Sequence, residues 1–233
     1  MGKEVSFLIN NCLMQFIISS VIAYLIGCLN FSIIITRMCG DKQDIRKKGS
    51  GNAGFTNVLR SVGVIPAILT FAGDFLKGVA AILIGKAICQ TIPGIDENTI
   101  IIQYIAYVAG FFCFLGHVYP CFFGFKGGKG ILTTWAVMLF IDWRVFLILI
   151  TIFLIVFFIT KIISLSSLSA AFSYPIITFV ITYFFDYKIT NSINYVIFAT
   201  SFSVLIAGIV IYKHKGNISR LLNGTEKKIT ERK

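Results

Sequence analysis

Long hydrophobic runs alternate with short polar segments along the whole chain. A helix needs about 20 apolar residues to cross the hydrocarbon core of a bilayer. Two of these runs exceed that length, and most of the others come close to it. We expect the first run to be one tilted helix, and the second to be a half-membrane or kinked segment that leads into one full span. The pattern predicts seven spans, of which the fourth is the shortest: 7–38, 61–92, 99–115, 131–141, 145–160, 170–185 and 195–212.

The composition supports an all-α integral membrane protein. Hydrophobic residues make up 57% of the chain and charged residues only 13%, whereas about 25% of the residues of an ordinary soluble domain are charged. The 233 residues accommodate the predicted spans as one domain, residues 1–233. No cleavable signal peptide is expected, because the apolar run that follows Ser6 is too long for one.

The lysines and arginines predict the orientation of the spans. Sixteen lie in or beside segments 37–60, 126–129, 161–169 and 213–233, and four are assigned to the opposite side: Lys3, Lys86, Arg144 and Lys188. The turns on that side include 93–98, 142–144 and 186–194. Basic residues favour the cytoplasmic side of a membrane. We therefore expect the N-terminus outside and the C-terminus in the cytoplasm. Topology and anionic lipid headgroups account for the net charge of +11, so no nucleic-acid partner is expected.

Several kinds of chemistry are disfavoured by spacing. The six cysteines contain no C-x-x-C pair, and the chain has two histidines and few acids, so neither a metal site nor a disulfide framework is expected. Walker and G-x-S-x-G motifs are absent, as is the H-x-x-x-x-D pair of a widespread acyltransferase class. We expect no cofactor. Most cysteines fall in apolar segments and are interpreted as small buried residues: Cys12, Cys28, Cys39, Cys89, Cys113 and Cys121.

The first polar cluster is GSGNAGFTNVLR, residues 49–60. Its three glycines allow sharp turns, and Thr56 or Asn57 could begin a helix whose free N–H groups receive an anion. Arg60, about one turn later, could make a bidentate phosphate contact. The alternative for Arg60 is a membrane anchor whose charged end extends to the surface.

The second cluster, GHVYPCFFGFKGGKG, residues 116–130, lies between two apolar segments. Lys126 and Lys129 bracket Gly127 and Gly128, so backbone N–H groups can approach a ligand that also faces two positive charges. These features predict an anion site, with phosphate as the leading ligand. The alternative is a plain basic loop beside the membrane, which would need neither the glycines nor His117.

Two residue pairs complete the polar pattern. His214 and Asn217 belong to the third cluster, KHKGNISRLLNGTE, residues 213–226. They are spaced i, i+3 and can meet one ligand if the helix continues; the alternative is a basic amphipathic tail on anionic lipid. Asp74 and Lys77 have the same spacing, and the alternative for them is a buried ion pair. Under the predicted topology, all three polar clusters lie on the cytoplasmic side.

The three clusters, in this order, resemble the acyl-phosphate-dependent glycerol-3-phosphate acyltransferases of bacterial membranes, the PlsY family. Segment 73–78, GDFLKG, also resembles a family motif, and the similarity covers nearly the whole chain. Ala53, Phe55, Cys28 and Gly216 depart from residues that are common in the family. The strings that carry the resemblance are GSGN (49–52) with Arg60, GH (116–117) with Pro120 and FKGGKG (125–130), and His214 with Asn217 and LLNGTE (221–226).

The resemblance implies transfer of a fatty acyl group from acyl phosphate, rather than acyl-CoA, to the 1-hydroxyl of glycerol 3-phosphate, the first step of phospholipid synthesis. It implies a multi-pass bacterial cell-membrane protein, which we expect to be monomeric. The residues that we assign to catalysis are Ser50, Arg60, Lys129, His214 and Asn217. Those that we assign to substrate or phosphate binding are Gly51, Asn52, Gly54, Thr56, Asn57, Asp74, Lys77, His117, Lys126, Gly127 and Gly128.

The identity of the general base stays open at this point. His117 or His214 could accept the hydroxyl proton, whereas the family resemblance favours the phosphate of the donor. Ser50 as a nucleophile is less favoured, because no adjacent base is evident. A second class of function is a small transporter or channel for an organic phosphate, but a carrier usually places polar groups near the midplane and often contains inverted repeats. No repeat is evident here.

Overall fold

The structure, a computed structural model, describes residues 12–39, 43–92, 94–95 and 100–229. Within these ranges all regular secondary structure is helical, which confirms the predicted all-α fold. The chain divides into two compact units, residues 1–141 and 142–233, and each is described by itself. That the whole chain acts as a single domain stays a prediction.

Six helical segments of the described residues are long and apolar enough to cross a membrane. The predicted fourth span is the helix α7 (Ile131–Ile141), whose 11 residues rise only about 16 Å, against about 30 Å of hydrocarbon. The integral membrane class is therefore confirmed, while seven spans and their orientation stay predictions. The six segments are Leu13–Cys39, Val64–Gln90, Ile100–Phe123, Trp143–Thr160, Ile163–Thr190 and Ile193–Lys213.

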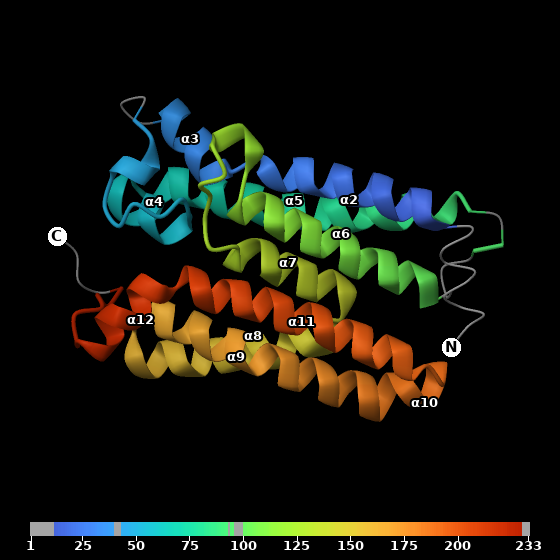
Figure 1. The fold of residues 1–233 in the computed structure, drawn as a ribbon. Helices are drawn as coiled ribbons and strands as arrows, with labels where there is room; N and C mark the ends of the chain where they lie inside the picture. Colours follow the sequence, from blue (N-terminus) through green and yellow to red (C-terminus); the bar gives the residue numbers. More distant parts are fainter. Residues whose placement is uncertain (1–11, 40–42, 93, 96–99, 230–233) are drawn as a thin grey trace. The chain divides into compact units, whose positions relative to one another are not determined.

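The bundle of the first unit consists of α2 (Leu13–Cys28), α5 (Val64–Gln90), α6 (Ile100–Val118) and α7. Helix α2 packs against α5 and α6, and α7 packs against the same two helices (Figure 1). The approach of α2 to α6 requires glycine, because a β-carbon at Gly27 would overlap the backbone of Cys113, and one at Gly116 would overlap the backbone of Tyr24. Small residues commonly allow membrane helices to pack this closely.

The first apolar segment contains two helices, so the prediction of one tilted helix is wrong. Helix α2 ends at Cys28, and α3 (Phe31–Cys39) follows after two residues. The side-chain oxygen of Asn30 accepts hydrogen bonds from Ser32 Oγ (2.6 Å) and from the backbone N–H of Ile33 (3.3 Å). This capping interaction starts a new helix inside an apolar run. Residues 7–11 of the predicted span lie outside the described residues.

Helix α5 is continuous over 27 residues, which corrects the predicted half-membrane or kinked segment. Its buried charges are paired instead: Lys77 Nζ lies 2.7 Å from Asp74 Oδ1. Further along the helix, Lys86 donates a hydrogen bond to the carbonyl of Phe140 (3.3 Å). That bond satisfies a carbonyl at the C-terminal end of the short helix α7.

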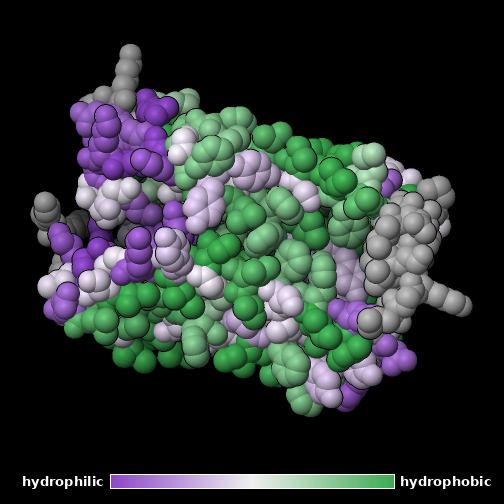
Figure 2. Space-filling view, in the orientation of Figure 1, coloured by the Kyte–Doolittle hydropathy of each residue, from purple (hydrophilic) through white to green (hydrophobic). Residues whose placement is uncertain are grey.

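Short elements connect the long helices at one end of the first unit. Figure 2 shows hydrophilic side chains gathered over the end that carries α3 and α4, and hydrophobic side chains along α2. A bundle that spans a membrane requires this distribution, with apolar sides and a polar end. The connecting elements are η2 (Ile45–Lys47), α4 (Phe55–Ser61) and η3 (Cys121–Phe123).

In the second unit, α9 (Ile163–Ile181) packs against both α8 (Trp143–Thr160) and α11 (Ile193–Lys213). The predicted inner turn at 161–169 is wrong, because only Lys161 and Ile162 separate α8 from α9. Lys161 adopts a left-handed conformation (φ 59°), which reverses the chain within two residues.

The predicted outer turns of the second unit are also shorter than expected. Asp142 caps α8, and Arg144 in its first turn forms ion pairs of 2.7 Å with both Asp142 and Asp186. After α9 the chain continues through a π-helical turn, η4 (Thr182–Asp186), and α10 (Tyr187–Thr190). The predicted loop 186–194 is therefore reduced to two residues before α11. Of the predicted turn 93–98, residues 93 and 96–98 lie outside the described residues.

The cysteines are free thiols, and four of them are buried as predicted: Cys12, Cys28, Cys89 and Cys113. Cys121 is half-buried. Cys39 is exposed at the end of α3, so the interpretation as a buried residue is wrong for it.

Candidate functional site

The glycine-rich loop between η2 and α4 is organised around the side chain of Asn57. This amide is buried, and its oxygen accepts a hydrogen bond from the backbone N–H of Ser50 (3.0 Å). Its nitrogen donates to the backbone carbonyls of Ile45 (3.2 Å), Lys48 (2.9 Å) and Asn52 (3.0 Å). Because Asn57 is engaged inside the loop, a positioning role describes it better than the predicted direct contact with phosphate.

The turns of this loop use glycine as the sequence predicts. Gly49 and Gly51 have positive φ angles of 55° and 71°, a region in which other residues are strained. The predicted start of the following helix is off by one or two residues, because α4 begins at Phe55 after Gly54. Ser50 and Arg60 are exposed, so their side chains are accessible to solutes.

The second loop doubles back along the end of α6. The backbone N–H of Gly127 donates to the carbonyl of Val118, and that of Gly128 donates to the carbonyl of His117, both at 3.2 Å. Lys126 is exposed and Lys129 is half-buried. The two glycines form a compact turn that carries the two lysines, and their N–H groups, for which the sequence predicts a ligand, hold the turn itself.

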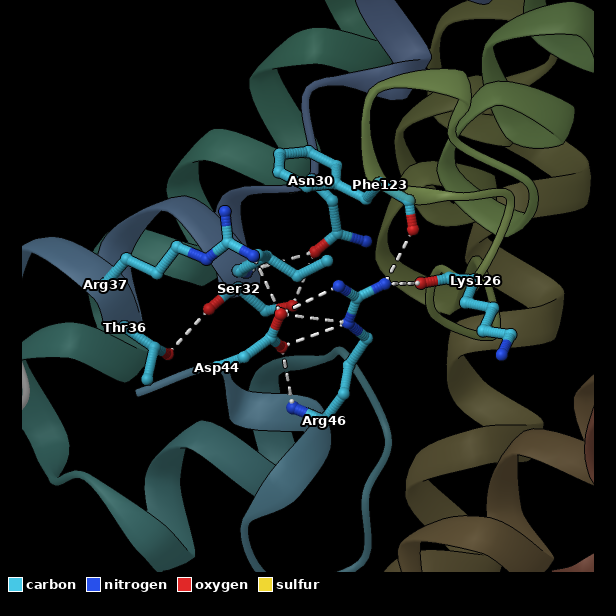
Figure 3. A network of polar contacts seen from close by, with 9 residues as sticks. Asn30, Ser32, Thr36, Arg37, Asp44, Arg46, Phe123 and Lys126 are labelled. Atoms are coloured by element: carbon cyan, nitrogen blue, oxygen red, sulfur yellow. Dashed lines mark hydrogen bonds and ion pairs between the residues drawn. The ribbon is translucent and has the colours of Figure 1, made fainter. Parts of the chain in front are cut away.

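A single arginine joins the two loops. Arg46 donates from one guanidinium nitrogen to the carbonyls of Phe123 (2.7 Å) and Lys126 (2.9 Å), as Figure 3 shows. The same guanidinium is held by Asp44, which also forms an ion pair with Arg37. Hydrogen bonds from Arg46, added to those from Arg37, outweigh partial burial and lower the pKa of Asp44 below its usual range.

Sequence reasoning missed this connection. It used Arg37 and Arg46 only as evidence for topology and gave Asp44 no role. The available signal was an acid two residues before an arginine, within a segment that is otherwise basic. The partner carbonyls, about eighty positions further along, leave no mark in the sequence.

The two loops also approach each other at Gly128. A β-carbon at this position would overlap the backbone carbonyl oxygen of Ala53, in the first loop, and the Nε2 atom of His117, at the end of α6. Gly128 is therefore enclosed between the first loop and the histidine. The close approach explains why glycine occupies this position.

Beneath this junction lies a buried cluster of Asp74, Lys77 and His117, whose exposed fractions are 1%, 4% and 4%. Lys77 Nζ lies 2.7 Å from Asp74 Oδ1 and 2.9 Å from His117 Nδ1. It also donates to the carbonyls of Gly27 (3.1 Å) and Leu29 (2.9 Å), at the break between α2 and α3. The alternative given for Asp74 and Lys77, a buried ion pair, is the arrangement found, and both residues are removed from solvent.

The third predicted cluster lies in the second unit, where α11 ends and α12 (Lys215–Leu222) begins. His214 stands at the joint, buried, with its Nδ1 atom 2.8 Å from the carbonyl of Val210. The helix therefore does not continue unbroken through His214 as the predicted pairing assumed. Asn217, in the first turn of α12, donates to Glu226 Oε1 (2.6 Å).

Glu226 collects several polar groups of the second unit. It accepts hydrogen bonds from Ser164 Oγ, at the start of α9, and from Arg220 Nε, both at 2.6 Å. Burial opposes ionisation of this carboxyl group, but the hydrogen bonds from Ser164, Asn217 and Arg220 prevail and lower its pKa. The carboxylate thus holds the chain after α12 against the beginning of α9.

Comparison with known proteins then gives the family. The family model described as glycerol-3-phosphate acyltransferase matches residues 17–224, which include the first two clusters and all but the last two residues of the third. The chain belongs to the glycerol-3-phosphate acyltransferase family.

Relatives with that same name match almost the whole of this chain. A protein of Syntrophomonas wolfei is 37% identical over 212 residues, which is 91% of this chain and 96% of the relative. One of Clostridioides difficile is 37% identical over 219 residues, with 94% and 98% covered.

Two crystal structures of PlsY, an integral membrane glycerol 3-phosphate acyltransferase, are similar to this chain. Its glycerol 3-phosphate form superposes with a TM-score of 0.71 at 34% identity, and its lysophosphatidic acid form with 0.72 at 33% identity. In both cases 91% of this chain and 94% of the other chain are covered.

In this member of the glycerol-3-phosphate acyltransferase family, the first unit gathers most of the predicted site residues around the two loops or beneath them. His214 and Asn217 belong to the second unit. In the part of the chain that the structure describes, no group of three or more His, Cys, Asp or Glu could hold a metal ion. The residues of the first unit are Ser50, Gly51, Asn52, Gly54, Thr56, Asn57, Arg60, Asp74, Lys77, His117, Lys126, Gly127, Gly128 and Lys129.

Proposed function

We propose that this protein transfers a fatty acyl group from acyl phosphate to the 1-hydroxyl of sn-glycerol 3-phosphate. The products are 1-acyl-glycerol 3-phosphate and inorganic phosphate, and the reaction is the first step of phospholipid biosynthesis. The observation that carries the proposal is the joining of two glycine-rich loops, by Arg46 and at Gly128, in a member of this family. Both substrates contain phosphate, which suits two loops that expose basic residues.

The reaction depends on alignment of the substrates and stabilisation of charge more than on a strong nucleophile or base from the protein. The 1-hydroxyl oxygen attacks the carbonyl carbon of the acyl phosphate, the bond from that carbon to the phosphate oxygen breaks, and phosphate leaves with the electron pair. The hydroxyl proton passes to the phosphate of the donor. Because acyl phosphate is a mixed anhydride with a good leaving group, holding the substrates in contact accounts for much of the rate.

Two anion sites are proposed. Ser50, Asn52, Thr56 and Arg60 supply much of one site, with Asn57 shaping it through the loop backbone. Segment 126–129 contributes its two lysines to the other site, and the N–H groups of Gly127 and Gly128 hold the turn that carries them.

His214 and Asn217 hydrogen-bond the glycerol backbone or the reacting carbonyl oxygen. No covalent acyl-enzyme, metal ion or cofactor takes part. His117 is less suited to act as a base than the sequence suggested, because it is buried and its Nδ1 atom faces Lys77.

The membrane context follows from the six apolar segments. We infer a multi-pass protein of the bacterial cell membrane that acts as a monomer, with its loops on the cytoplasmic side. The orientation is supported by the excess of lysine and arginine in the segments that carry these loops.

The test is a phosphate-release assay on the purified protein with palmitoyl phosphate, in the presence and absence of glycerol 3-phosphate, and with palmitoyl-CoA as a control donor. We expect release that depends on glycerol 3-phosphate, with formation of lysophosphatidate and no reaction of the CoA ester. Inactivity of a folded preparation would contradict the proposal, and flux of glycerol 3-phosphate into liposomes that contain the protein would then support a transporter.

The proposed phosphate contacts have their own test. Arg60→Ala and Lys129→Ala should each raise the KM of a phosphate substrate by about tenfold or more, because a hydrogen bond to a charged group contributes about 1.5–3 kcal/mol. Unchanged kinetics in both variants would exclude these two side chains from substrate binding.

A further inference from the structure

The buried cluster of Asp74, Lys77 and His117 has no role in the chemical steps above. Three ionisable groups this deeply buried are costly unless they are mutually paired. Asp74 Oδ1 also accepts a hydrogen bond from the backbone N–H of Phe31 (3.3 Å), at the start of α3. The cluster therefore connects four helices: α2 and α3 through their backbone, α5 through Asp74 and Lys77, and α6 through His117.

The geometry around His117 fixes the orientation of its ring. The Nδ1 atom lies 2.9 Å from Lys77 Nζ and 3.4 Å from Asp74 Oδ1. Both members of the ion pair therefore face the same side of the ring. This leaves Nε2 as the ring nitrogen that can face the two loops.

The Nε2 side of the ring faces the junction of the two loops. Nε2 lies where a β-carbon at Gly128 would stand, next to the carbonyl oxygen of Ala53. The backbone carbonyl of His117 also accepts the N–H of Gly128 (3.2 Å). One residue thus contacts the second loop through its backbone and faces the first loop with its Nε2 atom.

We propose that Asp74 and Lys77 are positioning residues that hold the His117 ring with its Nε2 atom toward the two loops, and thereby set the spacing of the phosphate-binding groups. This inference rests on the proposed function, because it assigns the cluster to substrate binding by that same site. None of the three side chains contacts a substrate. Lys77 acts through His117, and Asp74 acts through Lys77.

Two substitutions of the histidine test the role of Nε2. The amide group of glutamine reaches about as far as Nε2, whereas that of asparagine reaches only about as far as Nδ1. We expect His117→Gln to retain kcat/KM within about tenfold of the parent protein, and His117→Asn to lose about a hundredfold, the cost of a missing buried hydrogen bond and an unpaired partner. Both variants keep the Asp74–Lys77 ion pair, so both should fold.

The lysine is tested with a matched control on the same helix. Lys77→Met should raise the KM of one of the two phosphate substrates by about tenfold, with kcat changed by less than about threefold. Lys86→Met removes another lysine of α5, which is half-buried and donates to the carbonyl of Phe140, and should leave both KM values unchanged. A merely structural role for Lys77 would instead lower the active fraction, which reduces kcat and leaves KM as it was.

The outcomes separate the inference from the proposed function. An inactive parent protein would overturn both. An active parent protein with equal losses in His117→Gln and His117→Asn, or with no loss in either, would overturn the inference alone. A fall of kcat at constant KM in Lys77→Met would also overturn it, and if that variant fails to fold, the comparison of the two histidine variants decides.

Discussion

The guanidinium group of Arg46 lies 2.9 Å from the backbone carbonyl oxygen of Lys126. It contacts the carbonyl of Phe123 through the same nitrogen and is held on its other side by Asp44. Each of these loops can turn by itself, because each contains glycines with positive φ. The contact with Arg46 fixes one loop against the other, and so fixes the distance between the two proposed anion sites.

Loss of Arg46 should therefore impair catalysis although Arg46 is not proposed to contact a substrate. We expect Arg46→Ala to lower kcat/KM by about tenfold to a hundredfold, because hydrogen bonds from a charged donor contribute about 1.5–3 kcal/mol. Arg46→Lys should be intermediate, since an ammonium cannot reproduce the fork of a guanidinium. Steady-state kinetics with both substrates measures the effect. Lys47→Ala, at an exposed neighbouring position, is the control. An equal loss of kcat/KM in that variant would show that the removal of a positive charge, rather than the contact with the second loop, causes the effect.

Gly128 should tolerate no side chain. Alanine at this position would overlap the carbonyl of Ala53 and the ring of His117. We therefore expect Gly128→Ala to lower kcat/KM by about tenfold or more. It should also lower the free energy of unfolding by about 1–3 kcal/mol, the usual cost of overpacking. Gly208→Ala is the matched control, because a β-carbon there meets nothing within 4 Å and alanine favours a helix. Thermal unfolding in detergent and kinetics measure the two effects. Full activity of Gly128→Ala would show that the loops are not held at this spacing.

The segment that follows α12 should loosen in acid. The pKa of Glu226 is lowered in the folded protein, so its contribution to stability is complete above the unfolded pKa of about 4.3 and is lost as the pH falls through the folded pKa. The readout is hydrogen-exchange protection of the Ile229 amide, which donates to the carbonyl of Lys161 (2.9 Å). After correction for intrinsic exchange, protection should decrease below about pH 4.

Glu226→Gln supplies the control for this pH dependence. It removes the titrating group, so protection of Ile229 should be weaker than in the parent protein near neutral pH and nearly constant across the same range. Protection in the parent protein that is equal at pH 3 and pH 6 would contradict the role of the carboxylate.

A cysteine pair offers a direct test of the packing of α2 against the second loop. The Sγ atoms of Cys28 and Cys121 lie 3.5 Å apart, and a disulfide requires about 2.05 Å, so a small movement allows the bond. In a variant that keeps only these two cysteines, we expect diamide to oxidise both thiols to a disulfide, with a mass loss of two hydrogen atoms. Cys28→Ala in the same background should show no such loss. Two thiols that stay free under prolonged oxidation would contradict this packing.

Local features of the sequence were enough to predict the fold class and several parts of the site. A charged fraction of 13% excludes a soluble domain because too few charges exist to cover its surface. The spacing of Asp74 and Lys77 predicts their ion pair, since residues three apart share a helix face. The glycines at 49 and 51 predict a sharp turn because they tolerate positive φ.

Tertiary structure decided how those parts are joined. The break between α2 and α3 is concealed in an apolar run, and it is stabilised by Asp74 and Lys77 from another helix as well as by Asn30. The partners of Arg46 lie 77 and 80 positions away, and the orientation of the His117 ring depends on a lysine 40 positions away. The sequence by itself determined a helical membrane protein with basic, glycine-rich loops, because periodicity and glycine conformation are local properties. Only the packing decided which polar atoms hold the loops together, because hydrogen-bond partners distant in sequence are selected by the positions of the helices.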